Sequence, residues 1–454
     1  MKTKPVELRF PSAIGDLVKA ELDKPSVNYC ERVVICLAGK TVSEDKISVI
    51  VNKVYPVPEE SYILKDAGTA WDHKFTAEVV NHALELRLGL LIVHKHNSNH
   101  PDLSPQDKIS FRILLDRFRI LMDRQLHGSV VIGLDNSVGG VVNLPGDDEE
   151  KRTTLKVTSA VWLGSPIVFW PKEAKSRVPH KEMFNRQIAV IGENGQKRLF
   201  SSKVGIVGLG GGGSHVAQQL AHSGVGNFVL IDEDNIELSN MHRLIGSINK
   251  DIGKKKTEVI TRLIKSIYRN AKTEELAETF PTESTVKALK SADIIFSCVD
   301  TYQARSLLND FSWRHAIPLV DIGIGTEVSG KKSKGFKLEM LSGHAHIYMP
   351  GGPCMWCTGF LTKEKLEAEI SGKGPTYVKR VKSPAQIVSA NGVVASLAVT
   401  EALQLLTGYM ARDKNLSGFW FYDGKNERLY SQEASAKESC SLCKYTLGLG
   451  DTFW

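Results

Sequence analysis

The chain has 454 residues and a formal net charge of +7, with 42% hydrophobic and 24% charged residues. This length is about three times the commonest domain size, so at least two domains are expected. The composition is that of a soluble globular protein, and no apolar run reaches the roughly 18 residues of a membrane helix. The basic residues are scattered, which argues against a specific nucleic-acid surface. The N-terminus lacks the apolar stretch of a secretory signal, so we expect a cytoplasmic protein without a membrane partner.

The first part of the chain predicts a smaller, mixed α/β domain at residues 1–150. Residues 104–125 have apolar residues at helical spacing after a serine N-cap and a proline, which indicates a helix. Residues 151–182 mix charge with proline and are predicted to be a linker. Apolar runs predict strands at 32–39, 46–57, 88–96, 128–134 and 139–144.

A candidate metal site lies where the third of these strands ends. His94 and His96 project from one face of an extended segment, and Asp107 at the start of the predicted helix can complete a three-ligand zinc site. The open fourth position would hold water, whose pKa zinc lowers to about 7. Glu31, just before a predicted strand, is the candidate general base, and Ser104 would stabilise the oxyanion of a tetrahedral intermediate.

This pattern, H-x-H followed by S-x-x-D with a glutamate upstream, resembles the JAB/JAMM metalloprotease family over residues 15–146. Asn97 replaces the usual proline after the second histidine, which leaves every ligand in place. The resemblance implies a zinc peptidase that removes ubiquitin-like proteins or trims their C-termini. The alternative is a domain that only docks a ubiquitin-like protein.

Residues 183–454 change to a pattern of strand, glycine loop, helix and strand, with further strands at 292–300 and 317–325. This alternation predicts a Rossmann-like, doubly wound parallel sheet. A G-x-G-x-x-G motif precedes a helix that starts near Ser214, and its amide groups and helix dipole favour phosphate. Asp232 lies about 20 residues further on, at the end of the next strand, where its carboxylate can bind ribose hydroxyls. The motif glycines are Gly208, Gly210 and Gly213.

The charged residues that follow favour ATP over a nicotinamide cofactor. Arg243 and Lys256 supply cations for a triphosphate, and Asp300 at a strand end supplies a carboxylate for magnesium. A hydride-transfer enzyme needs no such set. A nicotinamide-dependent oxidoreductase is therefore the less favoured alternative.

The motifs "NRQI", "VGLGGGG", "GVGNFVLIDEDNIELSNMHR", "GKKK" and "VD" keep the order and spacing of the ubiquitin-activating, ThiF/MoeB-type superfamily. The chain resembles its adenylation domain over residues 183–445. The resemblance implies a homodimer in which an arginine from one chain reaches the partner's nucleotide. The implied nucleotide and magnesium residues are Gly211 on the phosphates, Asp232 on the ribose, Asn240, Arg243 and Lys256 on the triphosphate, Asp300 on Mg²⁺, and Arg186 across the dimer.

Four of the seven cysteines form two C-x-x-C pairs, Cys354 with Cys357 and Cys440 with Cys443. Their thiolates can hold Zn²⁺ tetrahedrally without an open position, so we expect a structural site, which also occurs in the resembling superfamily. The other cysteines have apolar neighbours and are predicted to be small buried residues. They are Cys30, Cys36 and Cys298.

Superfamily members that pass their substrate to a cysteine carry that residue in the stretch corresponding to 377–388, which has none here. The chain therefore stops at the acyl-adenylate, or another cysteine serves. Together the two resemblances imply one substrate, a ubiquitin-like protein that ends in glycine, with a conjugating enzyme as a further partner, as in bacterial ubiquitin-like conjugation systems. A sulfur-carrier-protein adenylyltransferase is the alternative that the missing cysteine favours.

Overall fold

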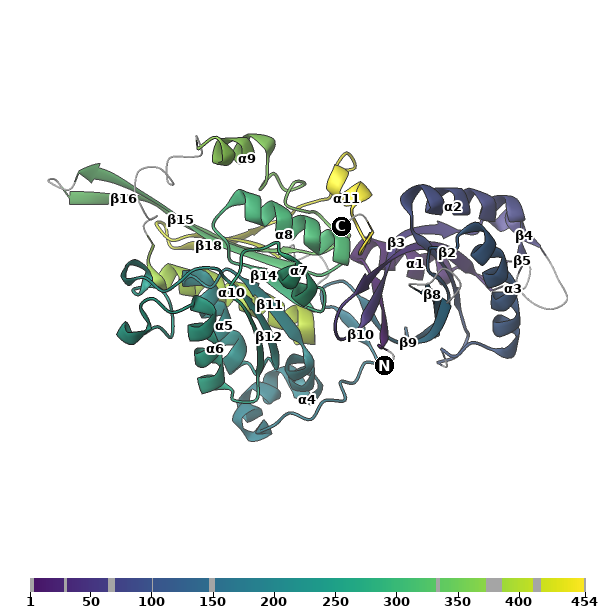
Figure 1. The fold of residues 1–454 in the computed structure, drawn as a ribbon, viewed down its shortest axis with the longest axis horizontal. Helices are drawn as coiled ribbons and strands as arrows, with labels where there is room; N and C mark the ends of the chain where they lie inside the picture. Colours follow the sequence, from purple (N-terminus) through teal and green to yellow (C-terminus); the bar gives the residue numbers. More distant parts are fainter. Residues whose placement is uncertain are drawn as a thin grey trace.

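The computed structural model describes residues 4–27, 31–63, 70–99, 101–146, 152–331, 335–372, 386–410 and 418–452. They form two α/β units that lie side by side along the longest axis of the molecule (Figure 1). Each unit contains an eight-stranded sheet, and these sheets differ in topology. The second unit has the parallel, doubly wound arrangement that the sequence predicts, which confirms that part of the fold class.

The sheet of the first unit closes into a barrel-like form. β1 pairs in parallel with β3 on one side and with β9 on the other. Closure of this kind removes strand edges that would otherwise be open to other chains. In sheet order the strands are β1 (Val6–Phe10), β3 (Ile47–Pro56), β2 (Val33–Val42), β6 (Gly89–Lys95), β7 (His127–Ile132), β8 (Val138–Pro145), β9 (Arg152–Trp162) and β10 (Val168–Trp170).

Helices cover both faces of the central strand β2, and this explains its unbroken apolar sequence. Val34 and Cys36 pack in one cluster with β1 and α1, whereas Val33 and Ile35 pack in another with α2 and α3. A strand that is buried on both faces has no polar alternation. The helices are α1 (Ser12–Leu22), α2 (His73–Leu86) and α3 (Pro105–Leu121), and a small hairpin near them contains β4 (Tyr62–Ile63) and β5 (Ala70–Trp71).

The prediction of a linker at residues 151–182 is wrong for most of that segment. β9 and β10 lie within it and complete the first sheet, where β9 pairs with β8, β10 and β1. The first half of β9 is largely exposed and polar, which gives it the composition of a loop, whereas Ala160–Trp162 are buried. The first unit therefore extends to about residue 170, and the segment between Trp170 and Lys181 is the longest part of the predicted linker without a regular element.

The second unit has a sheet with helices on both faces. Its first five strands in sheet order run parallel, and the remaining three continue the sheet in antiparallel fashion. A parallel sheet of this kind leaves the C-terminal ends of its strands free for ligands. The strands are β13 (Lys272–Leu276), β12 (Asn227–Ile231), β11 (Lys203–Val207), β14 (Ile294–Ser297), β15 (Leu319–Lys331), β16 (Gly335–Tyr348), β17 (Phe419–Asp423) and β18 (Arg428–Gln432).

The helices of the second unit divide between two apolar clusters. Four of them pack with the first cluster, namely α4 (Asn185–Ser201), α5 (Gly211–His222), α6 (Lys256–Ile267) and α10 (Val388–Thr407). Two of them, α7 (Glu283–Leu289) and α8 (Tyr302–His315), pack with the second, near the four cysteines. The short helix α9 (Lys363–Ile370) lies at the periphery, whereas the short helix α11 (Ser441–Tyr445) packs against α8 near the boundary with the first unit (Figure 1).

Among the described residues, α10 is the one helix that is long and apolar enough to cross a membrane. It packs against α4, α5 and strands β15 and β16 of the second unit. Ala395, Ala398 and Ala402 are fully buried or nearly so along its inner face. Its apolar composition is therefore accounted for by burial between the other elements of the domain.

Candidate functional site

The glycine loop joins β11 to α5 at the C-terminal edge of the parallel strands. Gly208 has a φ of 88°, and a Cβ atom there would lie 2.6 Å from the carbonyl oxygen of Cys298. A Cβ atom at Gly213 would overlap the Gly208 carbonyl group, so both positions require glycine. A Cβ atom at Gly210 would have no other atom within 4 Å. Because α5 begins at Gly211, its first amide groups have no partner within the helix and can bind phosphate oxygens.

Asp232 lies directly after β12 and beside the glycine loop. Its carboxylate accepts hydrogen bonds from the backbone N–H groups of Leu209 at 2.6 Å and Asp234 at 2.9 Å. β11 and β12 are parallel neighbours, so their C-terminal ends meet at one edge of the sheet. The fold thus brings the predicted ribose-binding carboxylate to the predicted phosphate loop.

Lys256 is the first residue of α6, and its side chain is buried beside two carboxylates. The ammonium nitrogen lies 3.2 Å from Asp232 and 2.6 Å from Asp234. Burial lowers the pKa of Lys256, but the two carboxylates raise it more, so the pKa lies above its ordinary value. A fixed positive charge therefore stands next to the glycine loop.

Arg243, Asn240 and Asp300 belong to loops that follow β12 and β14. Arg243 donates a hydrogen bond to the carbonyl oxygen of Ser239 at 3.0 Å. Burial lowers the pKa of Arg243, while the negative charge of Asp300 opposes that effect, so the two side chains interact electrostatically. The Asn240 side chain accepts a hydrogen bond from the Glu237 backbone at 3.1 Å, which caps a short 3-10 turn.

Arg186 is exposed in the first turn of α4, before the first strand of its own domain. Within the described ranges of the chain it has no hydrogen bond or ion pair with the nucleotide-site residues. The single chain therefore does not bring Arg186 to the other predicted site residues, and its role across a dimer stays a prediction.

Two residues that sequence reasoning missed also border the glycine loop. A Cβ atom at Gly211 would lie 3.0 Å from the side chain of Asn391 on α10, and one at Gly212 would lie 2.8 Å from Ile322 on β15. Asn391 is a buried polar residue in the first half of a mostly apolar helix, which is a signal that the sequence did offer. Ser214, where the sequence predicts the helix to begin, lies within its first turn and donates a hydrogen bond to Gly211.

The four paired cysteines form one cluster. The distances between sulfur atoms are 3.7 Å for Cys354 to Cys357, 3.6 Å for Cys354 to Cys440 and 3.6 Å for Cys357 to Cys443. Four sulfurs at the usual zinc–sulfur distance of about 2.3 Å, arranged tetrahedrally, would lie about 3.8 Å apart. Hydrogen bonds, the largest from Cys443, lower the pKa of Cys354 to about 6. The donor set therefore fits a structural zinc ion.

The predicted histidine site is also assembled. His94 and His96 have their Nε2 atoms 3.2 Å apart, and the Asp107 carboxylate lies 3.4 Å from the first and 3.2 Å from the second. Ligands of a tetrahedral zinc at about 2.1 Å would lie about 3.4 Å apart. Burial raises the pKa of Asp107, but hydrogen bonds from His94 and Ser104 lower it more, so this carboxyl group is ionised. The two imidazoles and the carboxylate thus fit zinc.

Glu31 and Ser104 lie beside this cluster with different local roles. A carboxylate oxygen of Glu31, just before β2, lies within 4.8 Å of one ring nitrogen each of His94 and His96. Ser104 is the N-cap of α3, and its hydroxyl group accepts a hydrogen bond from the backbone N–H of Asp107 at 3.1 Å. The cap fixes the position of Asp107, whereas the oxyanion role of Ser104 stays a prediction.

The remaining cysteines give no candidate nucleophile among the described residues. Cys36 is fully buried and Cys298 is partly buried, and burial raises the pKa of both thiols. Cys30 and residues 373–385, which include most of the predicted crossover stretch, lie outside the described residues.

A family model described as the ThiF family matches residues 184–444, more than half of the chain. The SAMP-activating enzyme E1 of Haloferax volcanii is 28% identical over 265 residues, covering 58% of this chain and 88% of that enzyme. The sulfur carrier protein ThiS adenylyltransferase of Escherichia coli is 26% identical over 262 residues, covering 57% and 94%. The ubiquitin-like modifier-activating enzyme 5 of Oryza sativa is 26% identical over 310 residues, covering 65% and 68%.

Proposed function

This chain belongs to the ThiF family, and from that premise we propose that its second unit adenylates the C-terminal glycine of a ubiquitin-like protein. The named relatives are activating enzymes or adenylyltransferases for a SAMP, a sulfur carrier protein or a ubiquitin-like modifier. The observation that carries the proposal is the meeting of the glycine loop with Asp232 and Lys256 at one edge of the sheet. A cytoplasmic location, where ATP is available, belongs to the same proposal.

In this reaction, a carboxylate oxygen of the protein substrate attacks the α-phosphorus of ATP. The bond from that phosphorus to the oxygen shared with the β-phosphate breaks, which yields an acyl-adenylate and pyrophosphate. Asp232 would accept hydrogen bonds from the ribose, and the amide groups of the loop would contact the phosphates. Lys256 and Arg243 would offset the negative charge on the departing pyrophosphate. Asp300 would hold Mg²⁺, which neutralises phosphate charge when it is bound.

The test is exchange of labelled pyrophosphate into ATP by the purified chain. Exchange should require a ubiquitin-like protein ending in glycine, and the same protein without its last glycine is the matched control. Exchange that needs no protein carboxylate would contradict the proposal. No exchange together with tight binding of a nicotinamide dinucleotide would favour an oxidoreductase instead.

A sulfur-carrier role is the alternative within the same chemistry. The relative from Escherichia coli is described as an adenylyltransferase for a sulfur carrier protein, and this observation favours it. The two roles differ in the acceptor of the acyl group. A thiocarboxylate formed with a sulfur donor would support sulfur transfer, whereas a thioester with a conjugating enzyme would support ligation.

For the first unit we propose a JAB/JAMM-like zinc peptidase that cleaves at the C-terminus of the same protein substrate. The observation that carries this proposal is the spacing of His94, His96 and Asp107, which suits three zinc ligands. Zinc would supply an activated water molecule when it is bound. Glu31 would take the proton from that water as general base, and Ser104 would face the developing oxyanion.

Cleavage of a ubiquitin-like precursor with residues after its terminal glycine tests the peptidase proposal. The unmutated chain should release the mature protein, and His94→Ala should not. If neither chain cleaves the precursor, the peptidase proposal is contradicted and the docking alternative is favoured. Adenylation of the mature protein should be unchanged in His94→Ala, because the residues of the two sites belong to different units.

A further inference from the structure

The two units share a buried polar interface. Arg9 of β1 is only 3% exposed and donates hydrogen bonds to the carbonyl oxygens of His315 at 3.0 Å and Ala316 at 3.3 Å in the second unit. The same guanidinium group pairs with Glu7 at 2.8 Å. Because buried charges are stable only when they are paired and hydrogen-bonded, these contacts fix one relative position of the two units.

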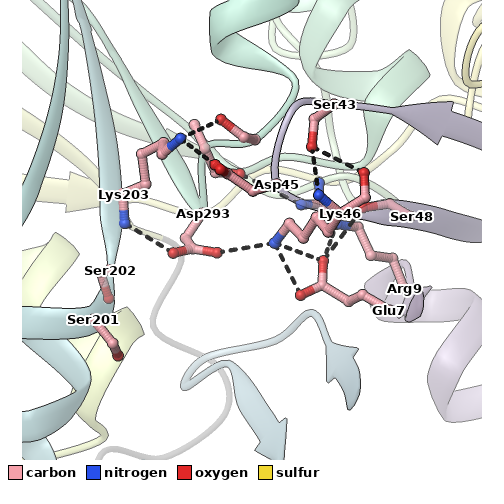
Figure 2. Close-up of polar contacts among 12 residues, drawn as sticks. Glu7, Arg9, Ser43, Asp45, Lys46, Ser48, Ser201, Ser202, Lys203 and Asp293 are labelled. Atoms are coloured by element: carbon pink, nitrogen blue, oxygen red, sulfur yellow. Dashed lines mark hydrogen bonds and ion pairs between the residues drawn. The ribbon is translucent and has the colours of Figure 1, made fainter. Parts of the chain in front are cut away.

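Figure 2 shows ion pairs that cross the same boundary. Lys46 of the first unit lies 2.9 Å from Glu7 and 3.5 Å from Asp293 of the second unit. The Asp293 carboxylate also accepts a hydrogen bond from the backbone N–H of Lys203 at 2.9 Å. The ammonium group of Lys203 in turn pairs with Asp45 of the first unit. The first unit is therefore docked and is not a freely tethered domain.

The segment 447–452, which follows α11, connects the two cores, and we name it the interdomain strap. Leu447 is buried in the cluster of the second unit that also contains Cys354 and Cys440. Leu449, two residues later, is buried in the cluster of the first unit that contains Val33. Figure 1 shows this segment, drawn in yellow, between the units. The strap thus places one apolar anchor in each core.

Backbone hydrogen bonds hold the strap on both sides. Gly448 donates to the carbonyl oxygen of Trp313 at 3.0 Å, and Gly450 donates to that of Arg314 at 2.9 Å, both in the second unit. On the first unit, Asp451 donates to the carbonyl oxygen of Lys40 at 2.7 Å. The strap therefore extends the hydrogen bonding of β2 at the end of that strand.

The approach of the strap to β2 is close enough to require glycine. A Cβ atom at Gly39 would lie 2.7 Å from the carbonyl oxygen of Leu449 and would overlap that of Gly448. Gly448 and Gly450 have φ values of 69° and 60°, which other residues rarely adopt. The glycines at these three positions therefore allow the strap to lie close against β2.

The opposite end of β2 lies next to the histidine site. Val33, at the other end of β2, pairs with His94, and Glu31 lies two residues before Val33. Ile92 on β6 shares its apolar cluster with both Val33 and Leu449. One strand and one cluster therefore join the strap to the residues predicted to hold the first unit's metal.

We propose that the four-cysteine site holds β2 and the histidine site in place through the interdomain strap. α11, which contains Cys443, has only five residues and is too short to be stable by itself. Metal held by the four thiolates would fix α11, and hence the start of the strap at Leu447. Loss of that metal loosens the start of the strap, weakens the packing of Leu449 in the first unit and so lowers the protection of β2. The inference depends on neither proposed catalytic activity.

Hydrogen exchange measured by mass spectrometry on the full chain tests this link. Metal is released from the cysteines of the zinc-loaded wild type with a stoichiometric mercurial reagent, and zinc release is measured with a chromogenic chelator. We expect amide exchange in β2 to accelerate more than threefold, while exchange in β11 and β12 stays unchanged. Acceleration of threefold or less after full release would overturn the proposal. Equal acceleration in β11 and β12 would also overturn it, since that result indicates global unfolding.

A strap variant separates the strap from the cysteines. Leu449→Asp should accelerate exchange in β2 to the same extent while the four-cysteine site keeps its metal, because a buried carboxylate without a partner expels the strap. Leu429→Asp, at a half-exposed position on β18, is the matched control and should leave β2 unchanged. If the amide groups of β2 exchange as slowly in Leu449→Asp as in the control, the proposal is overturned.

Discussion

The ammonium group of Lys256 lies 3.2 Å from the carboxylate of Asp232, so the residue predicted to bind the triphosphate is held by the residue predicted to bind the ribose. Asp234, which is largely exposed, is the second partner of the lysine at 2.6 Å. A triphosphate could replace Asp234 as that partner while Asp232 keeps its place. The cation is therefore positioned before the nucleotide arrives, which lowers the reorganisation needed in the transition state.

Lys256→Met should lower pyrophosphate exchange by about 10²- to 10³-fold, the usual effect of losing one preorganised charge stabiliser. Lys265→Met is the control, because that lysine lies at the far end of the same helix and donates to the Ala271 carbonyl group. Exchange rates at saturating ATP check the prediction. Equal rates for the two variants would remove Lys256 from the mechanism.

Asp300→Ala should abolish pyrophosphate exchange and leave the thermal unfolding midpoint nearly unchanged. The side chain is exposed after β14 and contributes nothing to the core, but its carboxylate is the proposed magnesium ligand. Exchange measured over a range of magnesium concentrations checks the first point, and thermal unfolding followed by circular dichroism checks the second. Near-normal exchange by the folded variant would contradict the assignment.

Arg186→Ala should inactivate exchange in a homodimer, and a mixture with Asp300→Ala chains should regain part of the activity. A mixed dimer contains one intact composite site if Arg186 acts on the partner's nucleotide. Activity after refolding or prolonged mixing, with subunit exchange followed by fluorescence, checks this. If the mixture regains no activity although subunit exchange is complete, Arg186 acts within its own chain.

The purified chain should contain about two zinc ions, one at the cysteines and one at the histidines. His94→Ala combined with Asp107→Ala should reduce this to about one, as measured by elemental analysis. Glu31→Gln should keep both ions and yet stop precursor cleavage, because an amide cannot accept the proton from zinc-bound water. A wild-type chain that holds only one zinc ion would contradict the peptidase proposal.

Glu7 should make the interface between the units sensitive to acid. Burial raises the pKa of Glu7, but Lys46 and Arg9 lower it more, from the ordinary 4.5 to about 2. The ionised carboxylate therefore stabilises the folded state fully above pH 4.5, and that stabilisation is lost as the pH falls from 4.5 toward 2. Denaturant unfolding should show this slope in the wild type. Glu7→Gln should be less stable at pH 7 and should show a shallower slope between pH 4.5 and 2.

The sequence by itself determined the elements whose signals are local. The glycine motif and the serine N-cap of α3 depend on neighbours within a few residues, the acidic residue follows about 20 residues later at the end of the next strand, and all three are present. The spacing of the cysteine pairs likewise predicts a cluster that the structure assembles. Close spacing limits the geometries that a chain can adopt, so such motifs are readable without a fold.

Only the tertiary structure decided the extent of the first unit and the way it is joined to the second. β9 looks like a linker in sequence because its polar half faces solvent, and its strand character comes from pairing with β1, which lies about 150 residues earlier. Likewise, nothing local distinguishes Leu447 from Leu449, although each enters a different core. Such assignments depend on long-range pairing and packing, which are absent from any short window of the sequence.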